Sequence, residues 1–154
     1  MTVRAKGAEG TEVLVSNHSA GRRWRLLLAD DHKPMLASVK ELLRVHYDVV
    51  GMACDGETLL DLVAKLDPDI AVIDISMPGL NGMAAARCLK DSGTRTKLIF
   101  LTIYANPEFV RAAFAVGALG YVLKRCMVTD LPLAIEAALA GKRFLSTPLA
   151  ESHR

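Results

Sequence analysis

Residues 69–83 read DIAVIDISMPGLNGM. The apolar residues Ile70 to Ile73 follow one another without a polar interruption, and Asp74 ends the run. A continuous apolar run of this length suits a strand that is buried on both faces, as in a parallel sheet covered by helices. The next segment, Met83–Asp91, is predicted to be a helix, with Ser92-Gly93 after it.

The same alternation extends along the chain in both directions. Further strands are predicted at WRLLLA (24–29), YDVVGMA (47–53), KLIFLT (97–102) and GYVLK (120–124). Further helices are predicted at Pro34–His46, Thr58–Leu66, Pro107–Val116 and Asp130–Ala140, with Thr129 as N-cap of the last and Gly141 past its end. The order (βα)5 predicts an α/β fold: an open, doubly wound parallel sheet of five strands with helices on both faces.

Polar side chains are expected to meet where these strands end. Asp30 and Asp31 follow the first strand, Asp74 follows the third, and Thr102 and Lys124 end the fourth and fifth. Ligands of open α/β sheets bind outside the carboxyl ends of the strands. Three crowded carboxylates repel one another, and their hard oxygens favour Mg²⁺, which also pairs with phosphate oxygens. A carboxylate can attack phosphorus, while a hydroxyl and an ammonium donate to the incoming phosphoryl group.

Each of these residues also has a purely structural explanation. Asp31 precedes a predicted helix and would suit its cap. Thr102 would be a plain strand-end hydroxyl, and Lys124 an exposed surface charge. The coincidence of five such side chains at strand ends favours the functional interpretation.

The chain from Trp24 to about Ala140 resembles the receiver (CheY-like) domain of bacterial two-component response regulators. The resemblance is carried by LLLADDH (26–32), AVIDISMPGLNGM (71–83), LIFLTIY (98–104) and GALGYVLKRC (117–126). It implies a flavodoxin-like fold with the (βα)5 order already expected. It also implies a signalling domain that accepts a phosphoryl group, and not an enzyme acting on an external substrate.

The resemblance implies a role for each residue of the acidic edge. Asp74 would be the phosphoacceptor. Mg²⁺, with Mn²⁺ as a substitute, would be bound by Asp30, more directly by Asp31, by Asp74 and by the backbone carbonyl of Ser76. Lys124 would pair with an oxygen of the phosphoryl group.

The resemblance also implies switch residues and residues that govern the lifetime of the phosphorylated state. Thr102 would move toward the phosphoryl group, and Tyr121 would reorient with it; the alternative for Tyr121 is a half-buried strand aromatic that does not move. Ser76 and Tyr104 would flank the water that hydrolyses the aspartyl phosphate. We expect the Tyr104 ring to hinder that water, and the alternative is that it covers the first turn of the following helix.

The sequence is more narrowly similar to the NarL/FixJ type of response regulator, through LTIYANPEFV (101–110), GALGYVLK (117–124) and GKRFLSTP (141–148). Proteins of this type usually continue into a LuxR-type helix-turn-helix domain, whereas this chain stops after a segment like the start of the interdomain linker. It is therefore expected to be either a stand-alone receiver or the receiver portion of a longer DNA-binding transcriptional regulator. The implied partner is a sensor histidine kinase or phosphotransfer protein, and the chain itself is expected in the cytoplasm. A homodimer on phosphorylation is compatible with the family.

The composition and the charge of the chain limit the classes of protein to which it can belong. The chain has 154 residues with 51% apolar residues, enough for one packed domain, and no apolar run long enough to cross a membrane. The domains expected are a flexible tail over residues 1–22, the receiver over 23–140 and a linker-like tail over 141–154. The net charge of +2 is concentrated at the two ends, which leaves the centre slightly acidic and argues against direct binding of nucleic acid. The three cysteines are expected to be reduced and packed in or near the core.

Other functions fit the sequence less well. An aspartate-nucleophile phosphohydrolase of the haloacid dehalogenase type needs a second Asp two residues after the nucleophile, where this chain has Ser76. A flavodoxin-like electron carrier needs a phosphate-binding loop after the first strand, where ADDHKP (29–34) would repel phosphate. A receiver that has lost its chemistry and serves as a scaffold would not be expected to keep the whole set of acidic, hydroxyl and lysine residues.

Overall fold

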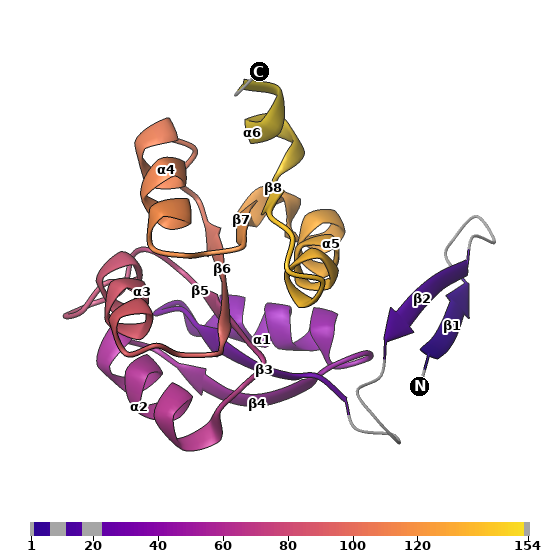
Figure 1. Cartoon of the computed structure of the whole chain (residues 1–154), viewed down its shortest axis with the longest axis horizontal. Coiled ribbons are helices and arrows are strands. Elements are labelled where there is room, and N and C mark those ends of the chain that lie inside the picture. Colours follow the sequence, from indigo (N-terminus) through magenta and orange to yellow (C-terminus); the bar gives the residue numbers. More distant parts are fainter. Residues whose placement is uncertain (1, 7–11, 17–22, 153–154) are drawn as a thin grey trace.

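The computed structural model describes residues 2–6, 12–16 and 23–152, and the side chains of residues 23–150 (Figure 1). A parallel sheet of six strands lies at the centre of this part of the chain, in the order β4-β3-β5-β6-β7-β8. The strands are β3 (Arg25–Ala29), β4 (Asp48–Ala53), β5 (Ile70–Ile73), β6 (Lys97–Thr102), β7 (Gly120–Leu123) and β8 (Phe144–Leu145). No helix in the described residues is long and apolar enough to span a membrane.

Helices cover both faces of the sheet (Figure 1). They are α1 (Lys33–Leu43), α2 (Gly56–Leu66), α3 (Gly82–Asp91), α4 (Pro107–Ala115) and α5 (Met127–Leu139), with a 3-10 turn at Lys124–Cys126 and a short α6 (Thr147–Ser152). Each helix buries one apolar side against the sheet. The sequence of strands and helices confirms the predicted α/β, doubly wound, flavodoxin-like architecture.

Two apolar cores lie on opposite faces of the sheet because successive strand residues point to opposite sides. In β3, Leu27 and Ala29 pack into the core that contains the buried sides of α2, α3 and α4. Leu26 and Leu28 pack into the second core, with α1 and α5. All four residues of β5 are buried, as the unbroken apolar run predicts for an inner strand.

The sheet has six strands, and the prediction of five is wrong on this point. Phe144 and Leu145 lie in the segment that the sequence assigned to a linker-like tail, yet they pair in parallel with Gly120 and Tyr121 of β7. The backbone N–H of Phe144 donates to the carbonyl of Leu119 at 2.8 Å. An open β7 edge would leave backbone donors and acceptors unpaired, and the tail supplies partners for them.

The amino end of α5 also differs from the prediction. The helix begins at Met127, because the chain leaves β7 directly into the 3-10 turn Lys124–Cys126, and its cap position is Cys126. Thr129 is exposed inside the first turn and is not the N-cap. The helix stop at Gly141 is confirmed, since its φ of 73° is the left-handed conformation that glycine adopts without strain.

The amino-terminal segment, expected to be a flexible tail over residues 1–22, contains two short strands. β1 (Thr2–Lys6) and β2 (Glu12–Ser16) pair antiparallel, with Thr2 opposite Ser16. The run VLV in β2 has the β-branched and apolar composition that favours a strand. The rest of the predicted tail, residues 1, 7–11 and 17–22, lies outside the described residues, and its flexibility stays a prediction.

Candidate functional site

The three predicted carboxylates lie together at the carboxyl edge of the sheet. Ala29 of β3 pairs with Ile73 of β5, so Asp30 and Asp74 leave two neighbouring strands at the same level. The N–H of Asp74 donates to the carbonyl of Ala29 at 2.8 Å, which ties the two strand ends together. One carboxylate oxygen each from Asp30, Asp31 and Asp74 lies within 4.8 Å of the others.

Asp31 does not cap α1, so the capping alternative is wrong. The cap position is His32, and no side chain makes a capping hydrogen bond there. Asp30 instead accepts a hydrogen bond from the N–H of His32 at 2.9 Å through Oδ1, which orients the loop after β3. Asp30 is buried and Asp31 is exposed, so Asp31 presents its carboxylate at the mouth of the cluster.

Lys124 reaches into this cluster from the end of β7. Its Nζ lies 2.7 Å from Oδ2 of Asp30 and 3.1 Å from Oδ2 of Asp74. Its side chain is only 14% exposed, which rules out the alternative of a solvated surface charge. One ammonium thus bridges the two buried carboxylates.

The negative charges of the cluster outnumber its positive charges. Burial raises the pKa of Asp74 and the neighbouring charge of Asp30 raises it further, while Lys124 and a hydrogen bond from the backbone of Ser76 oppose the rise. Burial lowers the pKa of Lys124, but its hydrogen bonds to Asp30 and Asp74 outweigh that effect and the pKa is raised overall. Three carboxylates against one ammonium leave a net negative charge in a set of hard oxygen ligands, which is the environment that Mg²⁺ suits.

The motif after Asp74 packs the amino end of α3 against the site. Asn81 caps α3 by accepting from the N–H of Ala84 at 2.8 Å. Gly82 lies so close to the backbone of Asp74 that a Cβ there would be 1.9 Å from the Asp74 carbonyl oxygen. The N–H of Gly82 donates to the carbonyl of Ile75 at 2.8 Å. A glycine is therefore required at this position to hold the loop after Asp74 against the helix.

Thr102 and Tyr121 both contact the backbone of Tyr104. Thr102 ends β6 fully buried, and its Oγ1 accepts from the N–H of Tyr104 at 3.3 Å. The Tyr121 ring is fully buried, and its hydroxyl donates to the carbonyl of Tyr104 at 2.6 Å. Burial and, to a smaller extent, the charge of Asp74 raise the pKa of Tyr121, which keeps this hydroxyl a donor. The burial of Tyr121 is compatible with both interpretations of this residue, and its reorientation stays a prediction.

The two residues expected to flank the hydrolytic water differ in their surroundings. Ser76 is exposed. The half-buried ring of Tyr104 stacks on Phe109 in the first turn of α4, with 4.9 Å between ring centres and 29° between the planes. This contact favours the alternative in which the ring covers the helix, and a shielding role for Tyr104 remains a prediction.

A residue that sequence reasoning missed lies beside Lys124. Ser146 is fully buried, and its Oγ accepts from the N–H of Leu123 at 3.0 Å. No signal in the sequence marks this serine, because it stands in a short polar segment that reads as a linker. The cysteines are free: Cys54 and Cys126 pack against the cores as expected, whereas Cys88 is exposed.

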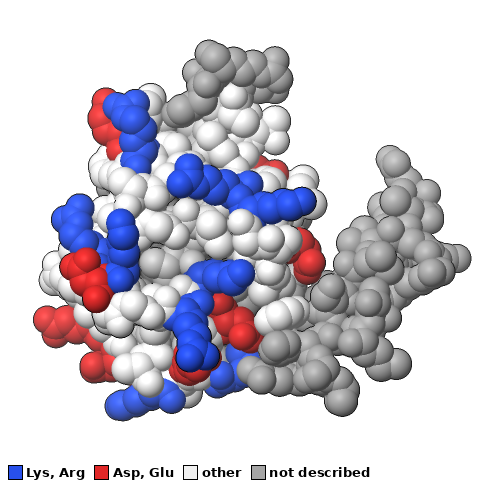
Figure 2. Space-filling view, viewed as in Figure 1, with Lys and Arg blue, Asp and Glu red and all other residues white. Residues whose placement is uncertain are grey.

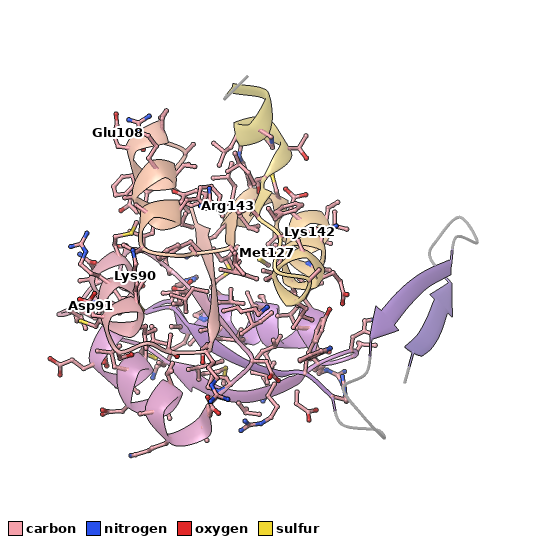
Figure 3. The ribbon with its side chains drawn as sticks, viewed as in Figure 1. Lys90, Asp91, Glu108, Met127, Lys142 and Arg143 are labelled. Carbon is pink, nitrogen blue, oxygen red and sulfur yellow. The ribbon has the colours of Figure 1, made fainter. Side chains whose placement is uncertain are left out.

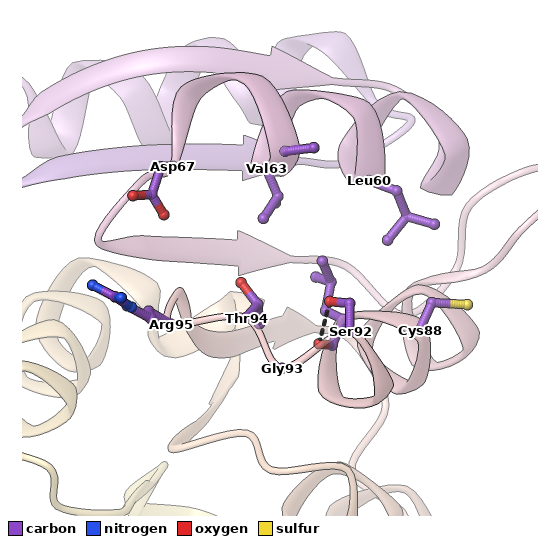
Figure 4. Close-up of a pocket in the computed structure, with 10 residues that line it drawn as sticks. Leu60, Val63, Asp67, Cys88, Ser92, Gly93, Thr94 and Arg95 are labelled. Atoms are coloured by element: carbon purple, nitrogen blue, oxygen red, sulfur yellow. Dashed lines mark hydrogen bonds between the residues drawn. The ribbon is translucent and has the colours of Figure 1, made fainter.

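A pocket of about 750 Å³ lies away from this edge, between α2 and α3 (Figure 4). Leu60 and Cys88 lie toward one end of it, and Asp67 and Arg95 toward the other (Figure 4). It contains none of the predicted site residues. The candidate site is therefore the open edge of the sheet at Asp74.

Comparison with known proteins agrees with this geometry. A family model described as the response regulator receiver domain matches residues 26–136. The transcriptional regulatory protein DesR of Bacillus subtilis is 37% identical over 128 residues, which cover 82% of this chain and 63% of DesR. The nitrate/nitrite response regulator protein NarL of Escherichia coli is 36% identical over 126 residues, which cover 80% of this chain and 58% of NarL. The chain thus spans about three fifths of the length of these relatives.

Solved structures give the same answer. A two-component response regulator of the LuxR family from Aurantimonas sp. superposes with a TM-score of 0.79 at 34% identity, over 84% of this chain and 94% of that chain. The isolated receiver domain of RcsB from Salmonella enterica superposes with a TM-score of 0.78 at 30% identity, over 84% and 98% of the two chains. With the predicted acidic residues and lysine gathered at one edge of the matching fold, the chain belongs to the response regulator receiver domain family, and its relatives are response regulators of the NarL/LuxR type.

Proposed function

We propose that this receiver takes a phosphoryl group onto the carboxylate of Asp74 from a phosphohistidine of a sensor histidine kinase or phosphotransfer protein. The observation that carries the proposal is the ammonium of Lys124 held between Asp30 and Asp74, at 2.7 and 3.1 Å, beside the exposed carboxylate of Asp31. An ammonium in this position meets an oxygen of the incoming group, so the negative charge that arrives with it has a partner.

The transfer forms one bond and breaks another. A carboxylate oxygen of Asp74 forms a bond to phosphorus, and the bond between phosphorus and the histidine nitrogen breaks. The leaving nitrogen keeps the electron pair, and the product is an acyl phosphate. Asp74 must be ionised to attack, and the hydrogen bond from Lys124 favours the ionised form against the effect of burial.

The cluster fits a divalent cation of the magnesium type. Asp30, Asp31 and Asp74 would hold it with the backbone carbonyl of Ser76. When bound, Mg²⁺ would neutralise charge on the transferred group and on the carboxylates. Mn²⁺, with similar ligand preferences, would serve as a substitute.

The contacts of Tyr104 suggest how the phosphorylated state alters the surface. Thr102 and Tyr121 each hold one backbone group of Tyr104, through the N–H and the carbonyl respectively. When Thr102 turns toward the phosphoryl group, the N–H of Tyr104 loses its acceptor. The loop between β6 and α4 then rearranges, and the interaction surface formed by α4 and its neighbours changes with it.

The chain further resembles the receiver portion of a longer transcriptional regulator. DesR is named a transcriptional regulatory protein, and RcsB has been solved in complex with DNA. On the face seen in Figure 2, Lys and Arg side chains are interspersed with acidic ones and form no continuous basic surface. We assign DNA contact to a further domain of such a regulator. Phosphorylation of the receiver would favour a homodimer.

Intact-mass spectrometry after incubation with acetyl phosphate and Mg²⁺ tests the proposal. The wild-type chain should gain one phosphoryl group that hydroxylamine removes. Asp74→Asn should gain none, while Asp91→Asn, at an exposed position on α3, should behave as the wild type. Undiminished labelling of Asp74→Asn would exclude Asp74 as the phosphoacceptor.

A further inference from the structure

The carboxyl-terminal tail forms the edge of the sheet next to Lys124. β8 pairs with β7, and the ladder continues past it: the N–H of Ser146 donates to the carbonyl of Tyr121 at 3.0 Å. Ser146 is fully buried, although it belongs to a segment that reads as a linker. The backbone of the tail therefore contacts the strand that carries both Tyr121 and the lysine.

Ser146 completes the ladder in an unusual way. In a regular parallel ladder, the carbonyl of Ser146 would accept from the N–H of Leu123. That carbonyl is instead used by the first turn of α6, where it accepts from the N–H groups of Leu149 and Ala150 at 2.9 and 3.0 Å. The hydroxyl of Ser146 replaces it and accepts from the N–H of Leu123 at 3.0 Å. A buried N–H that would otherwise lack a partner is thus satisfied by a side chain of the tail.

Leu123 directly precedes Lys124, so this hydrogen bond fixes the backbone from which the lysine side chain departs. The chain turns from β7 into the 3-10 turn at Lys124 itself. A strand end that is not held at Leu123 would let the starting point of the lysine side chain shift. A shift of about 1 Å in a positioned group is enough to lower a reaction rate substantially.

We propose that Ser146 is a positioning residue for phosphoryl transfer: its hydroxyl holds the end of β7 so that Lys124 lies between Asp30 and Asp74. This inference rests on the proposed function, and it makes the tail a component of the phosphoryl-transfer site. Ser146 itself does not touch the reacting groups, and it acts through the backbone of Leu123.

Two further contacts keep the tail in place. Leu149 of α6 is buried in the same core as Tyr121 and Leu123. Where the chain passes from α5 into the tail, Arg143 (labelled in Figure 3) places its guanidinium 5.0 Å from the centre of the Phe114 ring of α4. The serine is therefore held from both sides, by an apolar anchor and by a cation–π contact.

The test compares Ser146→Ala with a matched control, Thr96→Val. Thr96 is also buried and also makes a hydroxyl–backbone hydrogen bond, to the carbonyl of Pro68 at 2.8 Å, but next to the amino end of β6 and away from Lys124. Phosphorylation of each variant is followed by intact mass at increasing acetyl phosphate with Mg²⁺. Hydrogen exchange of the Leu123 amide is measured in parallel, to show that the hydrogen bond has been lost.

We expect Ser146→Ala to lower the maximal rate constant at least about fivefold, roughly 1 kcal/mol of barrier. Thr96→Val should stay within about twofold of the wild type, and Ser146→Thr, which keeps the hydroxyl, should retain most of the rate. The inference is overturned if Ser146→Ala loses Leu123 protection and yet reacts as fast as Thr96→Val. If Ser146→Ala does not fold, Ser146→Cys, with a weaker acceptor, replaces it, and an unchanged rate there has the same meaning. Failure of the proposed function is distinct, because the wild type itself would then remain unlabelled.

Discussion

Replacing Lys124 by methionine is expected to destabilise the metal-free protein by about 3 kcal/mol at neutral pH. The wild-type ammonium lies 2.7 and 3.1 Å from two carboxylates whose side chains are 5% and 6% exposed. At an effective dielectric constant of about 20, each contact corresponds to a gross attraction of about 5–6 kcal/mol. Desolvation of the three charges offsets most of this sum. We therefore estimate the net loss from the measured cost of removing one partner of a buried ion pair, which is about 3–5 kcal/mol. We take the lower end of this range, because Asp74 can take up a proton when the ammonium is absent.

The same reasoning predicts how the loss depends on pH. Lys124 lowers the pKa of Asp74, so its removal moves that pKa further above the ordinary value. A carboxyl group whose folded pKa is raised stabilises the fold at low pH, and that stability is lost as the pH rises through the folded pKa. The stability gap between Lys124→Met and the wild type should thus narrow at acidic pH and widen as the pH rises through the folded pKa of Asp74. Mg²⁺ should narrow the gap at neutral pH, because it supplies the missing positive charge.

Urea unfolding followed by fluorescence of Trp24, the single tryptophan, measures this gap. Lys65→Met, at an exposed position in α2, is the matched control and should change stability by no more than about 0.5 kcal/mol. A Lys124→Met variant as stable as the control, or a gap that does not change between about pH 4.5 and pH 7.5, would refute the role assigned to the ammonium.

Three other substitutions test separate parts of the site. Asp31→Ala should leave the stability of the metal-free protein unchanged or raised, because it removes one of three crowded carboxylates. In thermal melts, the mutant should lose most of the stabilisation that Mg²⁺ gives the wild type. Equal stabilisation of mutant and wild type by Mg²⁺ would exclude Asp31 as a ligand. Gly82→Ala should prevent stable folding, because its Cβ would lie 1.9 Å from the Asp74 carbonyl oxygen. Gly93→Ala is the control: its Cβ would meet nothing within 4 Å, so only the positive φ causes strain, and the variant should lose about 1 kcal/mol of stability in urea unfolding. Similar losses in the two variants would contradict the close packing at Gly82. Tyr104→Ala tests the shielding role. A ring that hinders the hydrolytic water predicts loss of the added mass about tenfold faster after removal of the phosphodonor, or about 1.4 kcal/mol of barrier, whereas an unchanged rate would show that the ring only covers α4.

The central sheet and most of its edge could be predicted because the relevant signals are local. The unbroken run Ile70–Ile73 indicates a strand buried on both faces, and the parallel order then brings Asp30, Asp74 and Lys124 to one edge. The edge position follows from topology alone, so it needs no knowledge of side-chain packing.

The features that escaped prediction depend on pairing with distant residues. β8 has only two residues, too few for any periodic pattern, and it forms because β7 offers an unpaired edge. Thr129 has the composition of a cap, but the 3-10 turn after Lys124 starts α5 earlier. Ser146 acquires its role only after β8 has paired and α6 has used its carbonyl. Excluding the capping role of Asp31 likewise required the structure, in which the cap position of α1 is His32.

Chemical location of the phosphoryl group tests the central claim most directly. Borohydride reduces an aspartyl phosphate to homoserine, which peptide mass spectrometry assigns to a position in the chain. After incubation with a phosphorylated histidine kinase and Mg²⁺, homoserine should be found at residue 74 and at no other aspartate of the chain. Homoserine at another aspartate, or phosphorylation that yields none, would contradict Asp74 as the acceptor that Lys124 and its neighbours are arranged to serve.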